Sequence, residues 1–144
     1  MKINLDYMRE FLSVMQEHEE PYIGLIDIAK KTGNGSTDHE FVFHYSLIVE
    51  NGLISRKDLS HGTLNEMGAS FTLDGTVSFG NLQIRLTQSG HDFALALKNR
   101  EVLNKLKTEL KDAPFKTVFD GSQKLLQHFF KKKLDQLMRE EPNT

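Results

Sequence analysis

The segment that most constrains the fold is an apolar stretch, STDHEFVFHYSLIVENGLI, which runs from Ser36 to Ile54. Thr37 and Glu40, three residues apart, form a capping box that predicts the start of a helix. Gly52 predicts its end, because glycine readily adopts the left-handed conformation that follows many helices. On a helical wheel, one continuous arc of apolar side chains is expected to face the core: Phe41, Val42, Tyr45, Ile48 and Val49. We therefore expect a buried helix here.

Two further elements are expected before this helix. Apolar residues at helical spacing predict a first helix that closes before Pro21: Leu5, Met8, Leu12 and Met15, with Tyr7 and Phe11 widening the stripe. The next segment, Tyr22–Ile28, fits either a short strand or the start of a helix. We favour a helix over Leu25–Thr32, so that two helices would be joined by a turn at Gly33.

A β structure is predicted after the buried helix. Leu53–Leu59 and Leu82–Thr87 alternate as two partner strands would. Between them, Asp74 and Gly75 separate two runs of β-prone residues, which is the strongest local signal for a hairpin. Together these segments predict a large β wing.

The last third of the chain is expected to be helical. Thr87 is a suitable N-cap for one helix, and a change of apolar face near Asn99 predicts that the helix kinks or restarts there. Pro114 predicts the start of a final helix that runs to about Glu140, with Gly121 as its weak point. The expected fold class is α+β: a winged helix-turn-helix core with a long β wing (residues 1–98) and a C-terminal helical extension (residues 99–144), packed as one compact unit.

Composition excludes several classes of protein. A chain of 144 residues is long enough to bury a core, and it contains no cysteine, which excludes disulfides, thiolate metal sites and thiol nucleophiles. No stretch is apolar enough for a membrane span, and the N-terminus lacks the pattern of a secretory signal, so a cytoplasmic location is expected. Residues 1–90 hold 7 basic and 12 acidic side chains, net −5, whereas residues 91–144 hold 11 and 8, net +3. An anionic partner would prefer the C-terminal part.

Three motifs resemble an uncharacterised bacterial and phage family, known only as a domain of unknown function. In that family a Tyr-His-hydrophobic helix runs into Ala-Gly-Leu-Ile, and Arg-Leu-Thr-x-x-Gly-His-x-Phe opens a later helix. Here Phe43-His44, Asn51–Ile54 and Arg85–Phe93 take those places. The resemblance covers most of the chain except Ala29–Thr37 and His61–Gly80, which look like insertions. It implies a winged-helix-like fold and a bacterial or phage origin, and it implies no activity.

A DNA-binding role is the first functional hypothesis, because winged helices often bind DNA. The outward face of the predicted recognition helix carries Phe43, Ser46, Leu47, Glu50 and Asn51, which offers one asparagine and no cation. Since bases and phosphates are usually met by Arg, Lys, Asn or Gln, this face is a poor DNA reader. The cations would have to come from elsewhere: Lys30, Lys31, Arg56, Lys57, Arg85 or the run at Lys131–Lys133.

The alternative hypothesis is a protein-interaction adaptor. Phe43 and Leu47 would then form an exposed apolar patch, unless the C-terminal helices cover them. Apolar residues spread over more than half of the last helix, so one neighbour cannot cover it, and a second subunit in a homodimer or another protein could. The interface residues expected on this helix are Phe129, Phe130, Leu134 and Leu137.

Nothing in the sequence predicts an enzyme. Its six histidines show no metal-binding motif, so no metal site is expected. His44 and His91 are expected to hold structure, with the His91 ring reaching the helix that bears His44. No phosphate-binding loop and no nucleophile elbow occurs, so no cofactor and no small-molecule substrate is expected. The sequence therefore predicts a non-enzymatic winged-helix protein, either a DNA-binding regulator or a protein adaptor.

Overall fold

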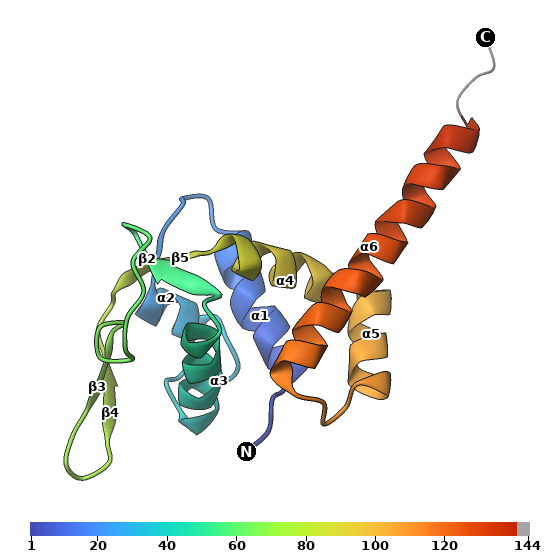
Figure 1. The fold of residues 1–144 in the computed structure, drawn as a ribbon. Helices are drawn as coiled ribbons and strands as arrows, with labels where there is room; N and C mark the ends of the chain where they lie inside the picture. Colours follow the sequence, from blue (N-terminus) through green and yellow to red (C-terminus); the bar gives the residue numbers. More distant parts are fainter. Residues whose placement is uncertain (141–144) are drawn as a thin grey trace. The chain divides into compact units, whose positions relative to one another are not determined.

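The computed structural model describes residues 1–140 and has an α+β fold, as predicted (Figure 1). The described chain forms six helices and five short strands, and it divides into two compact units, Met1–Ala94 and a second unit that begins at Leu95. The helices are α1 (Leu5–Gln16), α2 (Leu25–Lys30), α3 (His39–Glu50), α4 (Gln88–Lys98), α5 (Arg100–Glu109) and α6 (Phe115–Glu140). The strands are β1 (Ile23–Gly24), β2 (Ile54–Arg56), β3 (Ala69–Phe71), β4 (Val77–Phe79) and β5 (Gln83–Leu86).

Helix α1 supplies one wall of the core of the first unit. Its N-cap is Asn4, whose side chain accepts a hydrogen bond from the Tyr7 amide at 3.2 Å. The predicted apolar stripe is confirmed, because five residues of the helix are buried: Tyr7, Met8, Phe11, Leu12 and Met15. The Phe11 ring lies 5.9 Å from the Phe41 ring and 6.2 Å from the Tyr45 ring, so α1 and α3 share an aromatic core.

The ambiguous segment Tyr22–Ile28 contains both of the expected structures. Ile23 and Gly24 form the short strand β1, and α2 begins at the next residue. The helix ends at Lys30, two residues before the predicted end. The Thr32 hydroxyl donates to the Ile28 carbonyl at 2.8 Å, which satisfies one of the carbonyls that the end of the helix leaves open.

Helix α3 differs from the prediction in its cap and in its core face. Asp38, not Thr37, is the N-cap, and its carboxylate accepts from the Phe41 amide at 3.0 Å. The predicted end at Gly52 is confirmed, since its φ of +65° lies in the left-handed region. The buried residues are Phe41, His44, Tyr45 and Ile48. The predicted arc omitted His44 and included Val42 and Val49, which are only half-buried.

Strands β1, β5 and β2 form a three-stranded antiparallel sheet in that order. Ile54 of β2 pairs with Leu86 of β5, so the predicted partnership between these segments is confirmed. Strand β2 ends at Arg56, however, and not at Leu59. The chain turns there because Asp58 accepts hydrogen bonds from both the amide and the hydroxyl of Ser60, at 3.0 and 2.6 Å.

The predicted hairpin at Asp74-Gly75 is confirmed and joins β3 to β4. The Thr72 amide donates to the Thr76 carbonyl at 2.9 Å, and Gly75 takes a φ of +87°, which favours glycine. The Asp74 carboxylate accepts from the Thr72 hydroxyl and from the Thr76 amide. These hydrogen bonds, the one from Thr72 first, lower the pKa of Asp74 to about 2.

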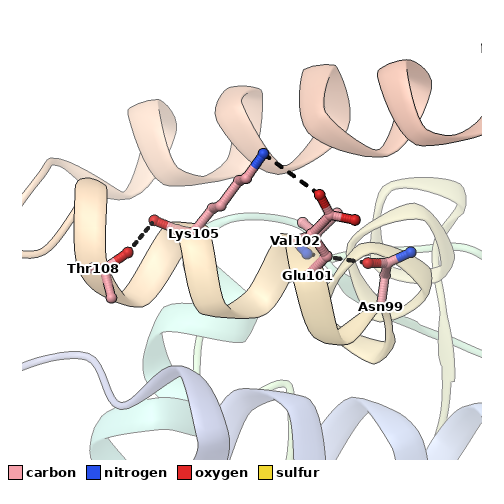
Figure 2. Close-up of polar contacts among 5 residues, drawn as sticks. All are labelled: Asn99, Glu101, Val102, Lys105 and Thr108. Carbon is pink, nitrogen blue, oxygen red and sulfur yellow. Dashed lines mark hydrogen bonds and ion pairs between the residues drawn. The ribbon is translucent and has the colours of Figure 1, made fainter. Parts of the chain in front are cut away.

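The predicted break near Asn99 is also confirmed. Thr87 caps α4 by accepting from the Gly90 amide at 3.1 Å. Helix α4 ends at Lys98, and Asn99 then caps α5 by accepting from the Val102 amide at 3.0 Å. Figure 2 shows this cap together with the ion pair between Lys105 and Glu101, whose atoms lie 3.6 Å apart.

In the second unit, α5 packs against α6. Helix α6 begins directly after Pro114, as predicted, and continues through Gly121 to Glu140. A side chain at Gly121 would meet a Leu110 methyl group at 2.8 Å, so glycine allows the close approach of the two helices. Among residues 1–140, no helix combines the length and the apolarity that a membrane crossing requires.

Candidate interaction surfaces

The five basic residues predicted to bind DNA do not form one cluster. Lys30 is the last residue of α2 and Lys31 follows it, and both are exposed. Arg56 ends β2, Lys57 follows it, and Arg85 lies within β5. Arg56 pairs with Ile84, the neighbour of Arg85 in β5. Because successive residues of a strand point to opposite faces, Arg56 and Arg85 project from opposite faces of the sheet.

An aromatic ring that the sequence argument missed lies beside one of these cations. The Lys57 ammonium lies 4.8 Å from the centre of the Tyr22 ring, at cation–π distance. Tyr22 directly precedes β1, and it lines the same surface hollow as Arg85. The structure therefore brings Lys57, Tyr22 and Arg85 to one region of the first unit, while Lys30 and Lys31 lie on another element.

The surface hollow has a volume of about 500 Å³ and lies between the end of α1, the α1–β1 loop, β5 and the first turn of α4. Its lining includes Arg85 and His91 as well as the acidic residues Glu19 and Glu20. The side-chain oxygen of Gln16, also in the lining, is buried and has no hydrogen-bond partner among the described residues. The charges are mixed, so the hollow offers no field of one sign that would select phosphate.

His44 has a structural environment, as expected, but with partners other than those predicted. The residue is 1% exposed. Its Nδ1 lies 2.7 Å from the Glu40 carbonyl and its Nε2 accepts from the Asn4 amide at 3.0 Å, so the ring is neutral with the proton on Nδ1. Its ring stacks on Tyr7 with the ring centres 4.5 Å apart. Burial lowers the pKa of His44.

The prediction that His91 reaches the helix bearing His44 is wrong. His91 is exposed and lines the hollow beside β5, while both ring nitrogens of His44 are occupied by Asn4 and Glu40. The helix of His91 begins at the end of β5, whereas His44 faces α1. No group of three His, Asp or Glu side chains placed to hold a metal occurs within residues 1–140.

The outward face of α3 carries few side chains that could contact the bases or phosphates of a nucleic acid. Within α3 itself His39 and Glu50 are the exposed residues, Asn51 after it is exposed as well, and the helix contains no lysine or arginine. The side-chain amide of Asn51 is the one group on this face suited to reading a base, and it donates to the Leu47 carbonyl at 2.8 Å. Phe43 and Leu47 are half-buried, and the Phe43 ring meets the His44 ring edge-on at 5.1 Å.

The β3–β4 hairpin packs against α3, which sequence reasoning did not anticipate. The Phe79 ring meets the rings of Phe41 and Tyr45 edge-on, at 5.2 and 5.9 Å. The Tyr45 hydroxyl donates to the Met67 carbonyl at 2.6 Å in a buried contact. Residues 61–80, which look like an insertion in the sequence, therefore help to cover the buried helix.

The predicted interface residues of α6 fall into two groups. Phe129 is half-buried and lines a small hollow with Val102 and Lys105 of α5, so it belongs to the packing between these helices. Phe130, Leu134 and Leu137 are exposed, and Met138, which lies beside them, is exposed as well. We call Phe130, Leu134, Leu137 and Met138 the distal stripe.

The side chains of the distal stripe are largely exposed on the second unit. The four side chains are 48%, 59%, 62% and 64% exposed, in chain order. Every residue from 131 to 140 is exposed. Figure 1 shows why in part: α6, with 26 residues, runs well past the end of α5, which has 10. At 1.5 Å per residue these helices are about 39 and 15 Å long, so α5 can pair with less than half of α6.

Comparison with known proteins adds no relative to this description. No family model, no curated protein and no solved structure matches the chain. The resemblance to the uncharacterised bacterial and phage family therefore stays a prediction that depends on the three motifs alone.

Proposed function

We propose that the chain is a non-enzymatic protein that acts by binding a helix of another protein through the distal stripe of α6. The exposure of four large apolar side chains on one helix carries this proposal. Monomeric proteins rarely leave such side chains together in water, and contiguous exposed apolar patches commonly mark interaction sites. A helix that presents an apolar row can pack against an amphipathic partner helix.

A winged-helix architecture for the first unit is part of the proposal. Helices α1, α2 and α3 and strands β1, β2 and β5 follow one another in the order of that fold. The sheet order β1-β5-β2 supports it, and so does the position of the β3–β4 hairpin in the connection between β2 and β5, where a wing would lie. In this interpretation the first unit is a scaffold, because its recognition-like helix α3 contains no lysine or arginine and most of its apolar side chains are buried or half-buried.

Site-specific photo-crosslinking in cells that produce the protein tests the proposed interface. A photoreactive residue replaces Leu134 in one variant and Gln136 in a matched control. Gln136 is exposed on the same helix and lies roughly 160° away around it, at about 100° per residue. We expect a discrete protein adduct from position 134 that is absent from position 136 and is lost when Leu137→Glu is added. Equal adducts at both positions, or none at either, would refute the proposal.

A DNA-binding regulator is the second candidate function, and the contact between Lys57 and Tyr22 beside Arg85 is the observation that favours it. Cations beside an aromatic ring suit a phosphate backbone with an unstacked base. Fluorescence anisotropy with mixed-sequence duplex and single-stranded DNA, at low and moderate salt, tests this function. Binding that weakens steeply with salt and is lost in a Lys57→Gln, Arg85→Gln variant would support it. A flat titration at low salt would exclude it.

A further inference from the structure

We infer that the helix bound by the distal stripe is acidic along the edges of its own apolar face, an inference that depends on the proposed function. The reason lies in the charges that border the stripe. At about 100° per residue, Lys131 and Lys133 are rotated roughly 60° and 100° from Leu134, in opposite directions. A lysine therefore borders each side of the apolar row, and the long stems of both can extend along a docked helix.

These lysines are available to a partner. Lys131 and Lys133 are exposed, and neither makes an ion pair within residues 1–140. The Lys133 ammonium lies 5.7 Å from the centre of the Phe129 ring, at cation–π distance, and the residue is exposed. From Lys124 to Glu140, α6 carries five basic and two acidic residues, net +3. A partner with glutamates or aspartates beside its apolar face would complement this field, which favours both specificity and fast association.

The same charges disfavour a second copy of the chain as the occupant. Packing two distal stripes face to face would bring Lys131 and Lys133 of both copies to one interface, with only Asp135 and Glu140 of each copy to offset them.

The width of the stripe favours a helix over a lipid surface. Its four residues cover an arc of roughly 100° around α6. Helices that lie in a membrane interface usually present a broader apolar face, whereas a narrow row is typical of the seam between two packed helices.

A defined peptide tests the inference with the full chain. The probe is a fluorescein-labelled helical peptide with leucine at its a and d positions and glutamate at its e and g positions. Controls are a peptide of the same composition in scrambled order and one with lysine in place of every glutamate. We expect anisotropy to show binding of the acidic probe in the range of about 1 to 100 µM, and at least tenfold weaker binding of both controls.

Variants and salt separate the two parts of the interaction. Leu134→Glu should abolish binding, the triple variant Lys131→Gln, Lys132→Gln, Lys133→Gln should weaken it at least about tenfold, and Gln136→Glu should change it little. Raising salt to about 0.5 M should weaken binding to the wild type and not to the triple variant. Circular dichroism of each variant checks that α6 still forms.

Four outcomes would overturn the inference. They are equal binding of the acidic and lysine peptides, no binding of the acidic probe at about 200 µM, sedimentation of the protein alone as a dimer through the stripe, or preferential binding to vesicles of phosphatidylserine and phosphatidylcholine. An adduct at position 134 in cells, combined with no binding of the acidic peptide, would leave the protein-binding function in place and remove only the acidic partner.

Discussion

The contact of His44 with α1 predicts how the first unit responds to acid. The Nε2 atom of this ring accepts a hydrogen bond from the Asn4 amide, and Nδ1 donates to the Glu40 carbonyl. A second proton on Nε2 would place two donors against each other and would put a charge in a buried position. The contact therefore requires the neutral ring, and the N-terminus of α1 depends on it.

The sign of the pH effect follows from the lowered pKa of His44 in the folded protein, which burial causes. Between that pKa and the unfolded value of about 6.5, the unfolded state binds more protons, so the free energy of unfolding rises with pH. The stabilisation is complete above about pH 6.5 and is lost as the pH falls below it. We expect the wild type to lose stability through this group as the pH falls below about 6.5.

The size of the contribution can be worked from the contacts that His44→Ala removes. Two hydrogen bonds contribute about 1 kcal/mol each, and the stacked pair with Tyr7 contributes about 1 kcal/mol. The substitution should therefore lower the free energy of unfolding by about 3 kcal/mol at pH 8. Its matched control is His39→Ala on the same helix, because His39 is exposed and its removal should cost less than about 0.5 kcal/mol.

Urea unfolding followed by tyrosine fluorescence measures this effect in the right part of the chain. The three tyrosines, Tyr7, Tyr22 and Tyr45, all lie in the unit Met1–Ala94. Subtracting the His44→Ala curve from the wild-type curve at each pH cancels the other five histidines. A difference that stays constant from pH 8 to 5, or that grows as the pH falls, would refute the assignment of a neutral, hydrogen-bonded ring.

Three further substitutions test the packing of the first unit by urea unfolding followed by circular dichroism. Gly90→Ala should lower the free energy of unfolding by more than about 2 kcal/mol, because the new Cβ would lie 2.0 Å from the Leu53 carbonyl oxygen. Ser89→Ala, at the exposed neighbouring position, should be nearly neutral. Equal effects of the two substitutions would contradict the close approach at Gly90. Tyr45→Phe should lower the free energy of unfolding by about 1 to 2 kcal/mol, because it leaves the buried Met67 carbonyl without the hydroxyl donor. An unchanged urea midpoint would contradict a stabilising role for this hydrogen bond. Phe79→Ala should lower the free energy of unfolding by about 2 kcal/mol or more, because the ring packs on Phe41 and Tyr45. Phe71, on the same hairpin, is 57% exposed, so Phe71→Ala should have little effect. The reverse order of effects would show that the hairpin does not cover α3.

Local signals predicted the helices and turns well, because each depends on a few neighbouring residues. Gly52 and Asn99 mark breaks that the backbone requires, and Asp74-Gly75 makes a turn through its own hydrogen bonds. The cap of α3 was misplaced by one residue because Thr37 and Asp38 both suit the position. Local sequence cannot decide between two adjacent capping residues, since the choice depends on how the incoming loop approaches the helix.

Contacts between distant segments were the part that the sequence could not supply. A wheel of α3 places His44 at the edge of the apolar arc, beside Ile48. Nothing in its neighbours indicates that the Asn4 amide, 40 residues away, satisfies its ring. In the same way, the spread of apolar residues on α6 indicated that a second neighbour was needed. Only the structure shows that Phe129 lies on the face of α6 beside α5, while Phe130 and Leu134 lie on an exposed face.

The distribution of apolar surface connects these contacts to the proposed function. A recognition helix has to leave polar side chains free in water, yet α3 directs its aromatic rings to α1 and to the hairpin, and Ser46 and Asn51 hydrogen-bond to its own backbone. Helix α6 does the opposite, because its distal stripe is apolar and exposed while cations border it on both sides. Burial of apolar area is the main driving force in association, and bordering charge selects the partner. We therefore propose that the binding surface of this chain lies on α6 and that the first unit is not a DNA-binding domain.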